Sequence, residues 1–276
     1  ALISLPVYFF PVMLNMPITW ENLILLSRIS SALIVGLSGV FLYLISSKFT
    51  TEKKSIFLTV IYLFATINFA TISQALWQHG TLELFTLISL YFLLCKNQSS
   101  KSLFYSGLFL GIAVLSRPTS ALAFILIFLY VFRKYGIKHT TSYLVGLAPS
   151  VLFFILYNQL FYLSIANQGY ASQIFENWKT PFYMGFLGLL FSPSKGIFIY
   201  SPVLIFSAVG TYLAFKNKNE NLIFKLFALI IFFHLLIIGA WKHWYGGWSF
   251  GYRMTSDVIP YMVLLLIPYV NSKLFE

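Results

Sequence analysis

Most residues of this chain that could do chemistry lie near the ends of its apolar segments. The chain has 18 lysine and arginine residues but only seven aspartate and glutamate residues. Three of the basic residues stand beside glycine or proline or at the start of an apolar segment, where a guanidinium or ammonium group can bind phosphate. These candidate phosphate ligands are Arg117, Lys195 and Arg253.

Two pairs of polar residues are spaced four apart, so that on an α-helix each pair would share one face. His79 and Glu83 could together bind a divalent metal or a polar group of a substrate. Alternatively, they are an interfacial histidine and a glutamate stabilised by a helix dipole. Arg253 and Asp257 either form a local ion pair or make a phosphate site in which Asp257 accompanies the arginine.

The stretch WKHWYGGWSFGYR, residues 241–253, holds three of the six tryptophans of the chain. Gly246 and Gly247 permit positive φ angles, which would allow the neighbouring aromatic rings to fold into a pocket. No phosphate loop, dinucleotide fingerprint, nucleophile elbow, HExxH motif or paired CxxC motif occurs in the sequence. Hydrolase, ATPase and structural-zinc functions therefore have no motif to support them.

The composition indicates an integral membrane protein. Hydrophobic residues make up 59% of the chain and charged residues only 9%, against roughly a quarter charged in soluble domains. Apolar runs recur along the whole sequence, which predicts one transmembrane domain over residues 1–276. The net charge of +11 comes mostly from short loops, which is typical of cytoplasmic loops and argues against nucleic-acid binding.

Hydropathy predicts an all-α, polytopic transmembrane helical bundle of about nine or ten spans or partial spans, with short helices in the outer loops. Pro118 and Arg117 are expected to break the apolar run 102–132 into two helices that enter and leave on the same side. The predicted spans are a partial span before Asn15 and the segments 22–47, 55–72, 81–95, 102–116, 120–132, 141–164, 197–215, 222–240 and 258–270.

The loops of this topology differ in composition on the two sides. The loops 48–54, 96–101, 133–139 and 216–225 and the tail are rich in lysine and arginine, which assigns them to the cytoplasm. All six tryptophans fall on the opposite, outer face. The outer carboxylates are Glu21, Glu83, Glu176 and Asp257. This asymmetry predicts an outer surface that holds a ligand with a sugar, lipid or prenyl component.

Four segments, in this order, resemble the polytopic GT-C-type glycosyltransferases that use polyprenyl-phosphate sugars. They are ALWQHGTLELF, GLFLGIAVLSRPTSAL, LFSPSKGIFIYSPVLIF and WYGGWSFGYRMTSDVIPYMVLLLIP. This broad group contains protein O-mannosyltransferases and lipid A aminoarabinose transferases. The resemblance covers nearly the whole chain and is closest to prokaryotic members. It implies inverting transfer of a sugar to a hydroxyl of a glycan, lipid or protein, at the outer face of a prokaryotic cytoplasmic membrane.

The resemblance also suggests roles for individual residues. Arg253, Lys195 and Arg117 would bind the donor phosphate, and Asp257 would orient Arg253. His79 and Glu83 would position the sugar or acceptor, or hold a divalent metal, although no cofactor is required. The aromatic side chains that would stack on the sugar or prenyl portion are Trp244, Tyr245 and Trp248.

The catalytic base is expected outside the sequence. In the family, this base is typically an aspartate in the first outer loop, and the chain resembles the part that follows that loop. We therefore expect the base upstream of Ala1 and expect the chain as given to be inactive.

Three other functions fit the same composition. A secondary transporter also uses proline- and glycine-interrupted helices with embedded charges, but the polar residues here gather on one face. A noncatalytic membrane subunit or scaffold that binds the lipid carrier would also lack a base. A polymerase of surface polysaccharide shares the donor, the face and the hydropathy.

Overall fold

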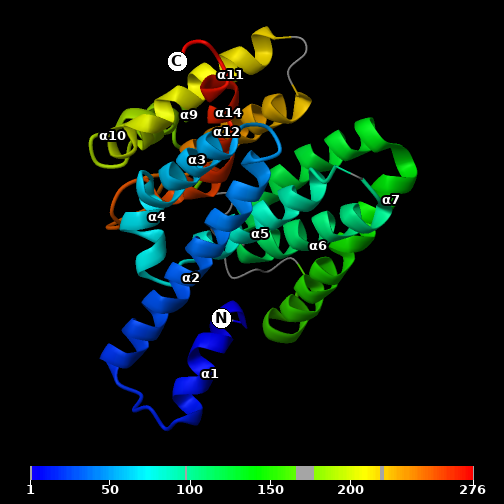
Figure 1. Ribbon diagram of the computed structural model, residues 1–276. Coiled ribbons are helices and arrows are strands. Elements are labelled where there is room, and N and C mark those ends of the chain that lie inside the picture. Colours follow the sequence, from blue (N-terminus) through cyan, green and yellow to red (C-terminus); the bar gives the residue numbers. More distant parts are fainter. Residues whose placement is uncertain (1, 97, 166–176, 218–220, 276) are drawn as a thin grey trace.

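The computed structural model describes residues 2–96, 98–165, 177–217 and 221–275, which form helices and no strand (Figure 1). Among the described residues, three helices are long and apolar enough to cross a membrane, namely Trp20–Ser46, Pro118–Tyr162 and Leu222–Ala240. The bent pair Glu52–Phe64 and Ile67–Gln74 would make a fourth span if it is counted as one. The all-α membrane class is confirmed, and the other predicted spans are shorter or broken helices.

The first part of the described chain forms seven α-helices and three short 3₁₀ helices, of which η1 (Leu2–Ser4) precedes α1, η2 (Ile72–Gln74) follows α4 and the third separates α6 from α7. The α-helices and this third 3₁₀ helix are α1 (Leu5–Met13), α2 (Trp20–Ser46), α3 (Glu52–Phe64), α4 (Ile67–Ala70), α5 (Gln78–Leu93), α6 (Ser100–Ser116), η3 (Pro118–Ser120) and α7 (Ala121–Tyr162). The second half contains α9 (Phe182–Phe191), α10 (Ile197–Tyr200), α11 (Phe206–Lys216), α12 (Leu222–Ala240), η5 (Arg253–Val258), α13 (Ile259–Leu264) and α14 (Leu266–Val270).

The predicted break between residues 116 and 120 is confirmed. Arg117 is extended, with φ −150° and ψ 120°, because the ring of the following Pro118 disfavours a helical conformation at this position. The predicted loop 133–139 is wrong in extent, since α7 is helical on both sides of a kink at Gly136 (φ 75°, ψ −179°). Phe124 stacks on Tyr143 at 5.5 Å between ring centroids, so the two halves of α7 pack against each other.

Three of the predicted spans are interrupted. Segment 55–72 bends after α3, where Thr66 caps α4 through its side chain. Segment 197–215 divides at Pro202, and segment 258–270 consists of the two short helices α13 and α14. Helix α9, which begins at Phe182, lies in the predicted outer loop between the spans 141–164 and 197–215. Residues 166–176 of that loop lie outside the described residues.

Close helix packing in the body depends on small residues. A Cβ atom at Gly107 would lie 1.9 Å from the backbone oxygen of Tyr143, and one at Gly146 would lie 2.0 Å from that of Phe104. Helices α6 and α7 therefore approach backbone to backbone, as small residues allow in membrane proteins. This contact holds α6, the helix that precedes Arg117, against α7.

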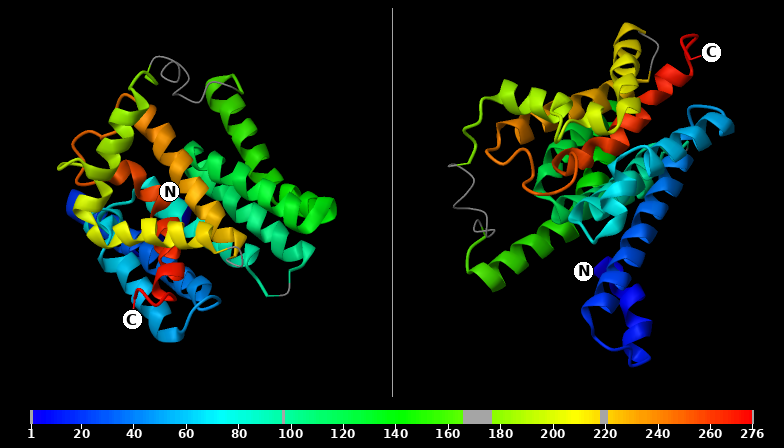
Figure 2. Two further views of the ribbon diagram at one scale, coloured as in Figure 1. Left: turned by 90° about the horizontal axis from the view of Figure 1, so that it is seen from above. Right: turned by 90° about the vertical axis from the view of Figure 1, so that its left-hand side faces the viewer.

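The predicted loop 48–54 contacts the tail and the end of a neighbouring helix. Thr50 donates a hydrogen bond to the side chain of Asn271 in the tail at 2.6 Å, and Lys48 donates to the backbone oxygen of Tyr91 near the end of α5 at 3.0 Å. The right-hand view of Figure 2 shows α2 (blue) and the end of α7 (green) extending from the body of the molecule.

Candidate active site

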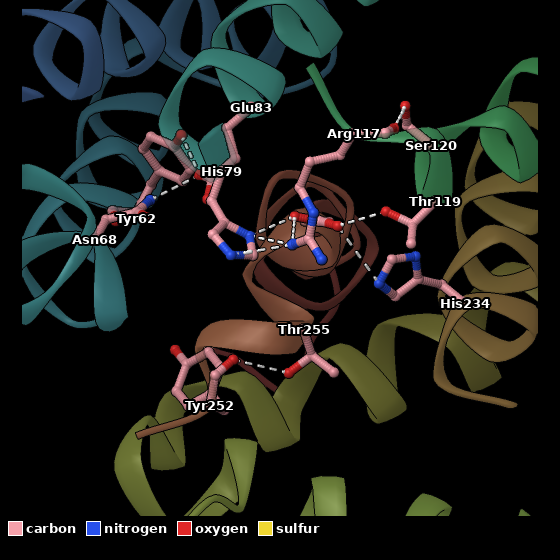
Figure 3. Close-up of polar contacts among 11 residues, drawn as sticks. Tyr62, Asn68, His79, Glu83, Arg117, Thr119, Ser120, His234, Tyr252 and Thr255 are labelled. Atoms are coloured by element: carbon pink, nitrogen blue, oxygen red, sulfur yellow. Dashed lines mark hydrogen bonds and ion pairs between the residues drawn. The ribbon is translucent and has the colours of Figure 1, made fainter. Parts of the chain in front are cut away.

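Four side chains from different parts of the chain converge on the carboxylate of Asp257 in η5. His79 Nδ1 in α5 and Arg117 Nη1 after α6 lie 2.8 and 3.0 Å from Asp257 Oδ1. Thr119 in η3 donates to Asp257 Oδ2 at 3.1 Å, and His234 Nε2 in α12 lies 3.8 Å from the same oxygen. Figure 3 shows these four side chains pointing toward one another. We call these five residues the Asp257 network.

The Asp257 network is buried and carries compensated charge. Arg117 is 6% exposed and Asp257 is 3% exposed. Arg117 Nη1 also contacts the ring of His79, 3.0 Å from its Nε2. Burial alone would raise the pKa of the Asp257 carboxyl, but the charges of Arg117 and His79 hold it below its usual range. The carboxylate therefore stays ionised, and its ion pair holds Arg117 in place.

Glu83 belongs to a separate buried contact in the same helix as His79. Tyr62 donates its hydroxyl to Glu83 Oε2 at 2.7 Å, and Asn68 Nδ2 donates to the same oxygen at 3.1 Å. Glu83 is 1% exposed, and its other oxygen has no hydrogen-bond partner among the described residues. Its hydrogen-bonded partners are thus neutral groups of the α3 and α4 segments.

Arg253 and Lys195 lie beside the Asp257 network and have no carboxylate partner within the described part of the chain. The Arg253 guanidinium lies over the ring of Trp77, 4.2 Å from its centroid, and Nη2 donates to the backbone oxygen of Gly246 at 3.2 Å. Lys195 Nζ donates to the backbone oxygen of Ser249. Both cations are therefore held in place by backbone and aromatic groups.

The three predicted phosphate ligands share one electrostatic neighbourhood. Burial and the charge of Arg253 lower the pKa of Lys195. Burial and the charge of Arg117 lower the pKa of Arg253. Arg253 Nε is buried without a hydrogen-bond partner among the described residues. A cluster of like charges with an unused donor is suited to an anionic ligand.

The expected pairing of Asp257 with Arg253 is wrong. The segment Arg253–Val258 is a 3₁₀ helix, which has three residues per turn, so residues four apart point about 120° from each other. Asp257 faces Arg117 and His79, whereas Arg253 faces Trp77. The sequence argument failed because it assumed α-helical geometry.

His79 and Glu83 lie in one helix, but they contact different groups. His79 bonds Asp257 and Glu83 bonds Tyr62. Within the described ranges, no three or more His, Cys, Asp or Glu side chains group together to hold a metal ion.

The three aromatic candidates are spread over the surface of their loop. Trp244 is partly buried against the core and packs on Gly188. Tyr245 is exposed and its hydroxyl lies 3.2 Å from His243 Nδ1, while Trp248 is fully exposed. Gly246 and Gly247 do adopt positive φ angles, 70° and 65°. The turn thus has the predicted backbone conformation, and Trp77 supplies the ring that stacks on Arg253.

Sequence reasoning missed three members of the site. Trp77 was recognised only as an outer aromatic residue, and Thr119 only as part of the break after α6. His234 was not considered, although an ionisable residue inside an apolar span is itself a signal of a functional site. Glu176, one of the expected outer carboxylates, lies outside the described residues.

An all-α membrane bundle with a cluster of partly buried cations defines a membrane protein suited to an anionic ligand. The family model of dolichyl-phosphate-mannose-protein mannosyltransferases matches residues 6–158, which is more than half of the chain. The chain belongs to this family, whose members are membrane glycosyltransferases with polyprenyl-phosphate-sugar donors. No curated protein and no solved structure gives a significant match.

The site is divided by the end of the matched range. The matched range contains His79, Glu83 and Arg117. The site residues that follow it in the chain are Lys195, His234, Arg253 and Asp257. The fold joins the two groups where His79 and Arg117 contact Asp257.

Proposed function

We propose that the chain binds the phosphate of a polyprenyl-phosphate sugar through Arg253 and Lys195. The reaction in which it takes part is the transfer of the sugar, with inversion, to a hydroxyl acceptor on the outer face of the membrane. The observation that supports this proposal is the pair of cations without a carboxylate partner among the described residues. A leaving lipid phosphate gains negative charge as its bond to the sugar breaks, and fixed cations stabilise that charge.

The roles in this proposal differ by position. Arg253 has no carboxylate partner among the described residues, and its planar group can bond two phosphate oxygens while stacking on Trp77. Lys195 supplies a second charge from the segment before α10. Arg117 is paired with Asp257, and it contributes its positive charge from a position near Arg253. His79, in this arrangement, positions Arg117 rather than a sugar.

The phosphate site is tested by binding, which requires no catalytic turnover. Polyprenyl monophosphate is titrated against the detergent-purified chain, with the corresponding polyprenol as the uncharged ligand. Arg253→Ala should weaken monophosphate binding about 10- to 100-fold, since charge-assisted hydrogen bonds contribute about 1.5–3 kcal/mol. Arg253→Lys should give an intermediate loss because it keeps the charge without the planar group.

Lys242→Ala is the matched control, because Lys242 is an exposed cation of the same loop. This variant should bind the monophosphate with an affinity within about twofold of wild type, because an exposed charge contributes little. Equal losses for monophosphate and polyprenol in Arg253→Ala, or equal losses in the two variants, would falsify the phosphate role of Arg253.

The outward orientation is tested by labelling. Cys95 is the single cysteine of the chain, and Trp248 is fully exposed. In a Cys95→Ser background, Trp248→Cys should react with a membrane-impermeant maleimide added to intact cells. Reaction only after the cells are opened would contradict an outward-facing site.

A further inference from the structure

His234 lies within the apolar helix α12 and faces the Asp257 network. It is 4% exposed. The distance of 3.8 Å between His234 Nε2 and Asp257 Oδ2 is too long for a direct hydrogen bond. Nε2 has no hydrogen-bond partner among the described residues. A buried polar nitrogen aimed at a carboxylate without bonding it calls for a bridging group.

A small cavity adjoins both groups. Its volume is about 10 Å³, close to the roughly 10–15 Å³ that one water molecule requires. The hydroxyl of Tyr261 is buried at this cavity and has no partner that meets hydrogen-bond geometry within the described residues. The polar residues that line it are Thr86, Thr119, Ser120, His234, Asp257 and Tyr261.

We propose that one water molecule binds in this cavity and bridges His234 Nε2 to Asp257 Oδ2, which makes His234 a positioning residue of the site. The water donates one hydrogen to the unprotonated Nε2 and the other to the carboxylate oxygen. Its own oxygen can accept the Tyr261 hydroxyl. This arrangement gives the water three partners, the number typical of buried waters.

The bridge fixes the second oxygen of the carboxylate. Oδ1 holds His79 and Arg117, while Oδ2 holds Thr119 and the water. A carboxylate that is bonded at both oxygens cannot rotate away from Arg117. The bridge therefore keeps the charge of Arg117 next to Arg253, and its effect on ligand binding rests on the proposed phosphate site.

The water and the state of the ring are tested first, without any ligand. A map of the protein at about 2 Å resolution should show one water between His234 Nε2 and Asp257 Oδ2. Nitrogen-15 NMR of histidine-labelled protein should show an unprotonated, hydrogen-bonded nitrogen in the signal that His234→Gln removes. A ring protonated at both nitrogens, or a map with ordered buried waters elsewhere and none here, would overturn the proposal.

The positioning role is tested with polyprenyl monophosphate. His234→Leu removes the acceptor for the water and should weaken binding about 3- to 10-fold, whereas His234→Gln, whose amide oxygen can accept the same bond, should restore most of the affinity. Phe233→Leu, at an exposed position of the same helix, is the matched control and should bind normally. If His234→Leu does not fold, Tyr261→Phe, which removes one partner of the water, should give a loss of about 2- to 3-fold.

The outcomes separate the two proposals. Full affinity in His234→Leu, with Arg253→Ala impaired, would refute the positioning role and leave the phosphate site standing. Full affinity in Arg253→Ala, with the water and the NMR signal as expected, would refute the phosphate site and leave the water bridge standing. Equal losses in His234→Leu and His234→Gln would show that the ring only fills space.

Discussion

Asp257 and Glu83 are both buried carboxylates, but their surroundings differ in charge. Asp257 contacts Arg117 and two histidines, and its partners come from segments up to 178 residues away in the chain. Glu83 accepts hydrogen bonds from a tyrosine hydroxyl and an asparagine amide only 15 to 21 residues away. Burial alone therefore does not tell which carboxylate belongs to the charged site.

The difference shows what each carboxylate does for the fold. A buried ion is tolerated where opposite charges and hydrogen bonds compensate its lost hydration. Asp257 meets this condition and joins α5, α6 and α12 to η5. Glu83 has no cation in hydrogen-bond contact among the described residues, and it joins α5 to the α3 and α4 segments through neutral groups. Isosteric neutral substitutions at both positions should separate these two roles.

Asp257→Asn is expected to have the largest effect. It removes the negative charge and leaves Arg117 buried without its counter-charge, which should lower the free energy of unfolding by about 3–5 kcal/mol. Unfolding in mixed detergent micelles at pH 7, followed by circular dichroism, measures this loss. A loss below that of Glu83→Gln would show that the cations do not depend on Asp257.

The pH dependence of this loss gives a second measurement. The pKa of the folded Asp257 carboxyl is lowered, so the stabilisation is present above the unfolded pKa of about 3.9 and is lost as the pH falls through the folded value. The difference between wild type and Asp257→Asn should therefore be constant near neutral pH and should shrink below about pH 4. A gap that does not narrow in acid would assign the loss to shape instead of charge.

The second prediction concerns the coupling of Asp257 and Arg117. A double-mutant cycle with Asp257→Asn and Arg117→Leu should give an interaction energy of about 1–3 kcal/mol, because each single variant leaves a partner unsatisfied. The double variant should accordingly be more stable than the sum of the single losses predicts. The same cycle on Glu83→Gln and Arg117→Leu is the control and should be additive within about 0.5 kcal/mol.

The sequence predicted the membrane class and the family, because both depend on composition and on segments of consecutive residues. It also placed Arg117 at a helix break, since the effect of Pro118 on the preceding residue is local. It failed where the outcome depended on helix type or on distant contacts. Asp257 was paired with Arg253 on the assumption of an α-helix, and the actual partner lies 140 residues away.

His234 and Trp77 are two further residues whose partners could not be predicted from the sequence. His234 is surrounded in the sequence by apolar residues, and nothing local indicates that its ring faces a carboxylate. Trp77 stacks on a guanidinium that follows it by more than half the chain. Such partners become visible only once the packing of α5, α12 and η5 is known.

The third prediction tests the neutral contact of Glu83. Tyr62→Phe removes the hydroxyl that donates to Glu83 Oε2 at 2.7 Å, while Asn68 continues to donate to that oxygen. The free energy of unfolding should fall by about 1 kcal/mol, the usual contribution of one hydrogen bond. Tyr43→Phe provides a matched tyrosine substitution on α2, away from this contact, and should be close to neutral.

Glu83→Gln should have the smallest effect of the series. The glutamine side chain has the same shape, and its amide oxygen can accept from Tyr62 and Asn68 as the glutamate does. Because no hydrogen-bonded cation loses a counter-charge, the free energy of unfolding should change by less than about 1 kcal/mol, well below the loss in Asp257→Asn. Binding of polyprenyl monophosphate should also remain within about twofold of wild type. A destabilisation equal to that of Asp257→Asn would mean that Glu83 compensates a buried positive charge, and the contrast between the two carboxylates would be wrong.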